Sequence, residues 1–125
     1  MKLLSIAVPC YNSAAYMDRC IRALLHGGEE VEILIVDDGS QKDNTGDIAD
    51  RYEREYPTIC RAIHQVNGGH GAAVMTGLRN ASGVFFKVVD SDDWVDPESY
   101  DKILDTLRDF TAKNTQLDLL ISNFV

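Results

Sequence analysis

The chain has 125 residues and a formal net charge of −8, from 12 Lys plus Arg and 20 Asp plus Glu. This length predicts one domain, and the acidic balance, with a pI of about 4.7, argues against a surface that neutralises nucleic-acid phosphates. Because 45% of the residues are hydrophobic and 26% are charged, the chain can bury a core, which argues against intrinsic disorder.

The first part of the chain predicts a strand followed by a helix. Residues 3–8 form a short apolar run, closed by Pro9, that is typical of a buried strand. Asn12 or Ser13 can cap the helix that follows, and Gly27-Gly28 permits a left-handed stop at its end.

The next part repeats this pattern. Residues 31–36 are rich in β-branched side chains and predict a second strand, which the polar residues 37–40 end. Apolar residues at helical spacing follow over 48–56, and Pro57 prevents the helix from continuing. Residues 58–64 predict a weaker third strand.

The last part predicts two more helices and two more strands. A helix opens at residues 67–71 and ends near Ser82-Gly83, and residues 84–89 form the fourth strand. Asp96-Pro97 begins the last helix, and residues 117–121 form a fifth strand. Strands that alternate with helices predict an α/β, Rossmann-like, mostly parallel sheet with helices on both faces.

Cysteine usage and hydropathy indicate the compartment. The three cysteines, Cys10, Cys20 and Cys60, are odd in number and lack C-x-x-C spacing, which predicts free thiols in a reducing compartment. No apolar run approaches the roughly 18 residues of a membrane-spanning helix, and the N-terminus is too short and too weakly basic for a secretory signal. We expect a cytoplasmic chain without a transmembrane segment, peripheral to a membrane only within a longer parent protein.

Polar clusters follow three of the predicted strands, at the end where open parallel sheets bind ligands. They are Pro9-Cys10-Tyr11-Asn12, Asp37-Asp38-Gly39-Ser40 and Asp90-Ser91-Asp92-Asp93. The three carboxylates of the last cluster repel one another unless water or a cation screens them. Because Asp90 and Asp92 point the same way in an extended segment, the cluster predicts Mg²⁺ or Mn²⁺ held together with diphosphate oxygens. The alternative is a solvated loop that caps the next helix.

The other polar segments admit both a binding and a structural interpretation. Asp37 or Asp38 can accept a hydrogen bond from a base imide or a ribose hydroxyl, although Asp-Gly-Ser is also common turn chemistry. Tyr11 can stack on a base or pack at the base of its loop. The Gly68-Gly69-His70-Gly71 stretch lets backbone approach a phosphate, but it is not G-x-G-x-x-G, which disfavours a dinucleotide fold. His70 alone is typical of a solvated loop histidine.

Taken in order, four motifs resemble those of family 2 glycosyltransferases. They are residues 5–12, residues 35–40 with Asp43-Asn44-Thr45, residues 67–73 and residues 89–93, and the resemblance extends from Leu3 to about Asn123. That family has the GT-A fold, and its N-terminal half binds a nucleotide-sugar, most often a UDP-sugar. The resemblance implies that residues 1–125 are the nucleotide-sugar-binding portion of such a domain, truncated at the C-terminus.

The resemblance also implies roles for individual residues. Pro9 and Tyr11 would flank the uracil, and Asp38 would accept the hydrogen of the uracil imide. The implied nucleotide-binding residues are Pro9, Tyr11, Asp37, Asp38, Gly71, Asp90 and Asp92, and the implied metal ligands are Asp92 and Asp93. The D-x-D region can be aligned in two registers, Asp90-x-Asp92 or Asp92-Asp93, and the implied cofactor is Mn²⁺ or Mg²⁺.

The implied reaction is a metal-dependent, inverting transfer of sugar to a glycan or lipid-linked acceptor in cell-surface polysaccharide synthesis. The catalytic base of the family is expected beyond Val125, so we expect this chain to bind donor and metal but to transfer sugar poorly by itself. Two copies could pair through an exposed sheet face or edge. Nucleic acid is not an expected partner.

Three alternatives come from other protein classes. A non-catalytic module would bind the nucleotide without transfer. A phosphorylation-receiver domain and a D-x-D phosphatase would each carry their aspartate pair after the first strand, whereas the candidate pairs here follow the second and fourth predicted strands. Labelling by acetyl phosphate would favour the receiver, and hydrolysis of a phosphomonoester would favour the phosphatase.

Overall fold

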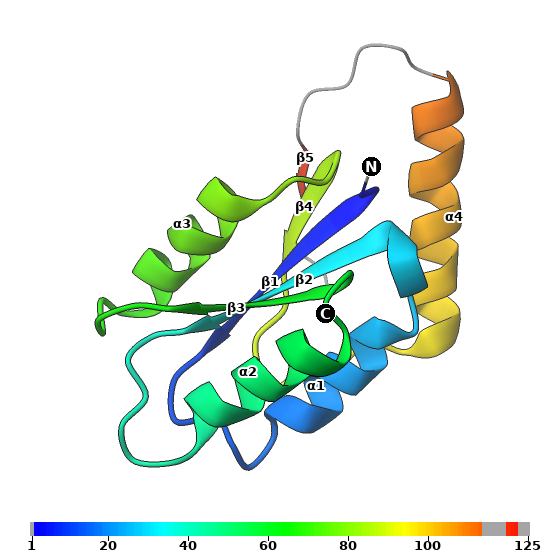
Figure 1. The fold of residues 1–125 in the computed structure, drawn as a ribbon. Coiled ribbons are helices and arrows are strands. Elements are labelled where there is room, and N and C mark those ends of the chain that lie inside the picture. The colour runs from blue at the N-terminus through cyan, green and yellow to red at the C-terminus, as the bar shows by residue number, and fades with distance from the viewer. Residues whose placement is uncertain (1, 114–119, 123–125) are drawn as a thin grey trace.

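The structure, a computed structural model that describes residues 2–113 and 120–122, contains one parallel sheet (Figure 1). Its described strands are β1 (Leu4–Cys10), β2 (Val31–Asp37), β3 (Cys60–His64), β4 (Phe85–Val88) and β5 (Leu120–Ser122). Every neighbouring pair is parallel, and the strands lie in the order β3-β2-β1-β4-β5. The predicted α/β class is therefore confirmed. Of the predicted fifth strand, residues 117–119 lie outside the described residues.

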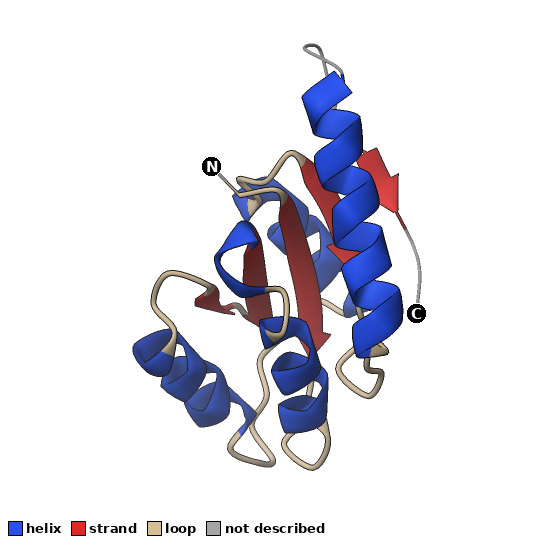
Figure 2. Cartoon of the chain, turned by 90° about the vertical axis from the view of Figure 1, so that its right-hand side faces the viewer, coloured by secondary structure: helices blue, strands red, loops and turns tan. Residues whose placement is uncertain are grey.

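The helices divide between the two faces of the sheet. They are α1 (Met17–Leu25), α2 (Thr45–Glu55), α3 (His70–Asn80) and α4 (Pro97–Lys113), with a 3₁₀ turn at Gly28–Glu30. α3 covers one face, and α1, α2 and α4 cover the other, as two directions of view show (Figures 1 and 2). Within the described ranges, no helix combines the length and the apolar character needed to cross a bilayer.

Both faces of the central strands are buried. Ile6, Val8 and Ile33 belong to a large core that includes apolar side chains of α1, α2 and α4. On the opposite face α3 approaches β1 closely, because a Cβ placed on Gly77 would lie 2.5 Å from the Ala7 Cβ. This double burial explains why β1 and β2 read as continuous apolar runs.

Pro9 lies inside β1 and does not end it, which corrects the prediction. The pairing of β1 with β4 stops at Ala7 and Val88, whereas its pairing with β2 continues to Cys10. A proline lacks the N–H that a ladder needs, so it is tolerated where one neighbouring strand has already ended. The sequence run alone did not reveal that β4 parts from β1 early.

The start of α1 also differs from the prediction, whereas the start of α4 agrees with it. α1 begins at Met17, without a side-chain cap, after a turn in which the Ser13 carbonyl accepts hydrogen bonds from two backbone N–H groups. Asn12 Oδ1 instead accepts a hydrogen bond from Lys42 N at 3.3 Å, and Ser13 Oγ accepts one from Ser91 Oγ at 2.9 Å. Asp96 caps α4, because its carboxylate accepts a hydrogen bond from Ser99 N at 3.0 Å.

Candidate functional site

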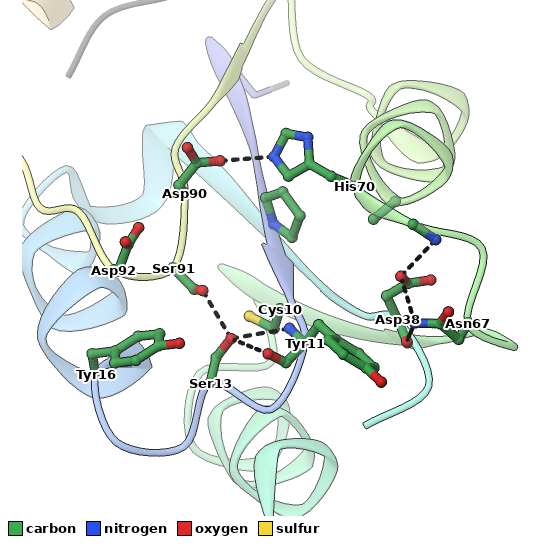
Figure 3. A pocket seen from close by; sticks show the side chains of 13 residues that line it. Cys10, Tyr11, Ser13, Tyr16, Asp38, Asn67, His70, Asp90, Ser91 and Asp92 are labelled. Carbon is green, nitrogen blue, oxygen red and sulfur yellow. Dashed lines mark hydrogen bonds and ion pairs between the residues drawn. The ribbon is translucent and has the colours of Figure 1, made fainter. Parts of the chain in front are cut away.

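A cleft opens at the carboxyl ends of β1, β2 and β4 (Figure 3). β2 and β3 lie on one side of β1, and β4 and β5 lie on the other, so the strand order reverses at this point. Ligands of open parallel sheets bind at such a reversal. The cleft has a volume of about 500 Å³ and is lined by Pro9, Cys10, Tyr11, Ser13, Tyr16, Asp38, Asn67, Gly69, His70, Ala73, Asp90, Ser91 and Asp92.

Most of the predicted site residues come together here. Pro9, Tyr11, Asp38, Asp90 and Asp92 line the cleft: Pro9 lies in β1, and the other four come from the segments that follow β1, β2 and β4. Asp37 and Gly71 are not among the lining residues. Asp93, the other predicted metal ligand, groups with the carboxylates of Asp90 and Asp92.

The Asp38 carboxylate is buried and holds the loop that leads into α3. Its Oδ1 accepts hydrogen bonds from Gln65 Nε2 and Gly68 N, both at 2.8 Å, and its Oδ2 accepts them from Gly69 N at 2.9 Å and Asn67 Nδ2 at 3.2 Å. A carboxylate has about four lone-pair sites, so these donors occupy all of them. Burial alone would raise the Asp38 pKa, but the hydrogen bonds from Gln65, Gly68 and Gly69 outweigh burial and lower it.

The Asp37 carboxylate serves the loop behind the cleft. Its Oδ1 accepts a hydrogen bond from Ser40 N at 3.0 Å, and its Oδ2 lies 3.0 Å from His64 Nδ1. The other ring nitrogen of His64 lies 2.7 Å from Asp50 Oδ1. The hydrogen bonds to Asp50 and then to Asp37 raise the pKa of His64 above its ordinary value. His64 therefore links the ends of β2 and β3 to α2.

Hydrogen bonds connect the loop after β1 to the segment between β2 and α2, beside the cleft. Asn12 N donates a hydrogen bond to Ser40 Oγ at 2.9 Å, and Ser13 N donates one to Thr45 Oγ1 at 2.7 Å. Asn12 has a φ of +49°, which is uncommon for a residue other than glycine and is held here by these contacts. These two hydrogen bonds fix the backbone next to Tyr11.

Ser13 connects the loop after β1 to the acidic loop after β4. Its hydroxyl accepts a hydrogen bond from Tyr11 N at 3.0 Å and donates one to Tyr11 O at 3.2 Å. The Ser91 hydroxyl donates a hydrogen bond to Ser13 Oγ at 2.9 Å, and this contact is buried. Because Ser91 lies between Asp90 and Asp92 in the chain, this hydrogen bond fixes the acidic loop relative to Tyr11.

The acidic loop can hold a hard divalent cation. Carboxylate oxygens of Asp90, Asp92 and Asp93 lie within 4.8 Å of one another. Mg²⁺ holds oxygens at about 2.1 Å in an octahedron, so opposite ligands lie about 4.2 Å apart. The three side chains therefore need only a small adjustment to share one ion, and all-oxygen ligands suit Mg²⁺ or Mn²⁺. Asp93 N also donates to the Asp90 carbonyl at 3.0 Å, and this turn brings both registers of the D-x-D region to one place.

His70 extends from the first turn of α3 to the acidic loop (Figure 3). Its Nε2 lies 2.9 Å from Asp90 Oδ1, and the two side chains are 65% and 50% exposed. A Cβ added at Gly69 or Gly71 would meet no atom within 4 Å, so the backbone on either side of His70 is open.

The cleft includes residues that sequence reasoning missed, above all Ser13, Asn67 and His70. Ser13 was expected to cap a helix, but its hydroxyl partner Ser91 lies 78 residues further along the chain. Asn67 Nδ2 donates to the Asp38 carbonyl at 3.0 Å, across 29 residues. These partners depend on the order of the strands. For Asn67 and His70, the one signal in the sequence is the Asn-Gly-Gly-His stretch at the start of a predicted helix.

Cys10 lines the cleft but does not have the properties of a nucleophile. Cys10, Cys20 and Cys60 are free and buried, which confirms the predicted free thiols. Burial raises the pKa of Cys10 far above its ordinary value and raises that of Cys20 to about 12. The thiols therefore stay protonated at neutral pH, and the chemistry of the cleft depends on its carboxylates, hydroxyls and imidazole.

Comparison with known proteins agrees with this geometry. Residues 5–118 match the family described as glycosyl transferase family 2. Over 123 residues the chain is 36% identical to the uncharacterised glycosyltransferase EpsJ of Bacillus subtilis (strain 168), a match that covers 98% of this chain and 34% of EpsJ. The chain thus spans about a third of the length of the curated relatives that it matches.

Solved structures share the GT-A fold. A crystal structure of S. aureus TarS in complex with UDP-GlcNAc matches with a TM-score of 0.74 and 30% identity, over 87% of this chain and 32% of that chain. The mannosyltransferase PcManGT from Pyrobaculum calidifontis, in complex with GDP-Man and Mn²⁺, matches in fold with a TM-score of 0.65 and 23% identity, over 73% of this chain and 28% of that chain. The motifs in their predicted order, the parallel sheet and the family match over residues 5–118 together show that the chain belongs to glycosyl transferase family 2.

Proposed function

We propose that this chain binds a UDP-sugar, with the base at the Asp38 end of the cleft and the diphosphate at the acidic loop. The observation that carries the proposal is that Asp38 and Asp92, from loops after different strands, line one cleft of about 500 Å³. Such a volume suits a ligand of nucleotide size. The complexes of TarS with UDP-GlcNAc and with UDP support a uridine donor.

At the base end, Tyr11 and Asp38 hold the uracil in this proposal. Tyr11 is 51% exposed, so its ring is available for stacking, and Pro9 flanks it. The uracil imide N–H replaces Asn67 Nδ2 as a donor to the Asp38 carboxylate. Asn67 can release the carboxylate because its Nδ2 also donates to the Asp38 backbone carbonyl at 3.0 Å. Asp37 has a supporting role here, since its carboxylate is engaged by Ser40 N and His64.

At the other end, Asp92 and Asp93 together with Asp90 hold Mn²⁺ or Mg²⁺. When bound, the cation neutralises charge on the departing diphosphate. The chain positions these carboxylates through the hydrogen bond between Ser91 and Ser13. A Cβ added at Gly71 would meet no atom within 4 Å, so in this proposal the diphosphate has space to approach the start of α3 there.

For the whole protein we propose an inverting sugar transfer. The bond from the anomeric carbon to the diphosphate oxygen breaks, a bond to the acceptor hydroxyl oxygen forms on the opposite face, and the hydroxyl proton passes to a carboxylate base. The proposed acceptor is a glycan or a lipid-linked glycan of cell-surface polysaccharide synthesis. The proposed location is the cytoplasm. We also propose that two copies of the chain pair.

Thermal-shift titration with UDP, GDP and CMP, each with and without Mn²⁺, tests the proposal. We expect UDP to raise the Tm, Mn²⁺ to increase this rise, and Asp93→Ala to abolish the increase. Asp109→Ala is the control, because Asp109 is an exposed α4 carboxylate that binds Lys113. A rise in Tm with GDP or CMP but not with UDP would contradict a uridine donor. No rise in Tm with any of the three nucleotides would contradict a nucleotide site.

A further inference from the structure

The charge balance of the cleft is unfavourable for a diphosphate. Its lining includes three carboxylates, those of Asp38, Asp90 and Asp92. Among the described residues that line it, none is Lys or Arg, and His70 contributes the imidazole. A nucleoside diphosphate brings more negative charge, which these carboxylates repel. A cation at the acidic loop would offset part of this repulsion, and a hydrogen-bond donor beside it would offset more.

The geometry points to His70 as a diphosphate-binding side chain that exchanges its bond to Asp90 for a bond to a phosphate oxygen. This inference rests on the proposed function. His70 Nε2 lies 2.9 Å from Asp90 Oδ1. If the Asp90 carboxylate ligated a cation, Nε2 would lose this partner and be left beside the proposed diphosphate position. His70 is 65% exposed, so its ring has room to turn between staggered rotamers.

The backbone beside His70 supports an anion at the same place. The first N–H groups of a helix have no partner within it, and α3 has 11 residues. Asp38 accepts hydrogen bonds from Gly68 N and Gly69 N, and the next N–H groups along the chain, at the start of α3, are those of His70 and Gly71. Because a Cβ at Gly69 or Gly71 would meet no atom within 4 Å, a phosphate has space to approach.

A bracing role for His70 makes a different prediction from a diphosphate-binding role. If His70 only held the acidic loop in place, its removal would weaken the binding of the cation and of UDP together. If His70 exchanges partners, its removal frees Asp90 for the cation and removes a donor from the diphosphate. Cation affinity and UDP affinity then change differently.

Calorimetric titrations of the unchanged chain and of His70→Ala test this inference with Mn²⁺ alone, uridine and UDP plus Mn²⁺. We expect His70→Ala to weaken UDP binding about tenfold and to leave uridine affinity within about twofold, because uridine lacks the diphosphate. Mn²⁺ alone should bind at least as tightly as before. His26→Ala is the matched control, because it removes another exposed His–Asp pair, with Nε2 3.0 Å from Asp101 Oδ1, and should change none of these affinities.

His70→Gln separates a lost hydrogen bond from a general disturbance. Glutamine retains an N–H donor, so we expect it to recover part of the UDP affinity, and no recovery would contradict a hydrogen bond to phosphate. Unchanged UDP affinity in His70→Ala would overturn the inference. Equal losses for UDP and uridine, or weaker binding of Mn²⁺, would also overturn it. If the unchanged chain bound neither uridine nor UDP, the proposed function would fail and the role of His70 with it.

Discussion

The two ends of the cleft are built in different ways. At the base end, the Asp38 carboxylate is 3% exposed and all of its lone-pair sites face donors from its own chain. At the cation end, Asp92 is exposed and the Asp90 side chain is half-exposed, and within the described residues Asp90 has one side-chain hydrogen-bond partner, His70. Apart from the exchange of the Asn67 donor, the first end is preorganised, and the second depends on its ligand. We therefore expect nucleoside binding to be independent of cation and diphosphate binding to require it.

The largest expected effect is at the cation end. Replacing both Asp92→Asn and Asp93→Asn should weaken UDP binding in Mn²⁺ by about 100-fold, because the chain loses two anionic oxygen ligands. Uridine affinity should not change, since the base end does not use these side chains. Calorimetry with both ligands checks this, and Asp105→Asn on the exposed side of α4 is the control. Equal loss of uridine binding would show that the two ends are not separate.

Asp38→Asn should disturb the base end and its stability together. In the variant, the amide NH₂ group faces N–H donors that in the unchanged chain bind a carboxylate oxygen. We therefore expect the free energy of unfolding to fall by about 2 kcal/mol. The Asp38 pKa is lowered in the folded chain, so this contribution is present above the ordinary pKa of about 3.9 and is lost as the pH falls through the folded value. Urea unfolding measures it, with the exposed Asp47→Asn as control. An unchanged midpoint would contradict the arrangement.

Tyr11→Ala should weaken uridine and UDP about equally, by about fivefold or more, because base stacking contributes about 1–3 kcal/mol. Tyr11→Phe retains the ring and should bind almost as well as the unchanged chain. Fluorescence or calorimetric titration with and without Mn²⁺ distinguishes the two variants. A loss that appears only with Mn²⁺ would assign Tyr11 to the cation end.

The smallest expected effect concerns His64, behind the base end. Its pKa is raised by Asp50 and then by Asp37, so its stabilising contribution is fully present below the ordinary value of about 6.5 and is lost as the pH rises through the higher folded value. The difference in unfolding free energy between the unchanged chain and His64→Gln should therefore be larger at about pH 6 than at about pH 9. The half-exposed ring limits its size. His26→Gln is the control, and a difference that grew with pH would reverse the assignment.

Local sequence chemistry was sufficient to predict the sheet and much of the cleft. The alternation of apolar runs and helical patterns identifies the parallel sheet, and the convergence of Asp38 and Asp92 follows from their positions after strands. The early separation of β4 from β1, which allows Pro9 within a strand, depends on pairing between distant segments. The partners of Asp37 and Ser13 likewise come from elements that are distant in sequence, so their supporting roles could not be predicted from spacing.

A crystal structure of this chain with UDP and Mn²⁺ tests the central claim most directly. We predict that the uracil lies against Tyr11 near Asp38, that the ion is coordinated by Asp92 or Asp93, and that the diphosphate lies between them. Uracil at the acidic loop, or UDP bound outside this cleft, would contradict the division of the cleft into a preorganised base end and a ligand-dependent cation end.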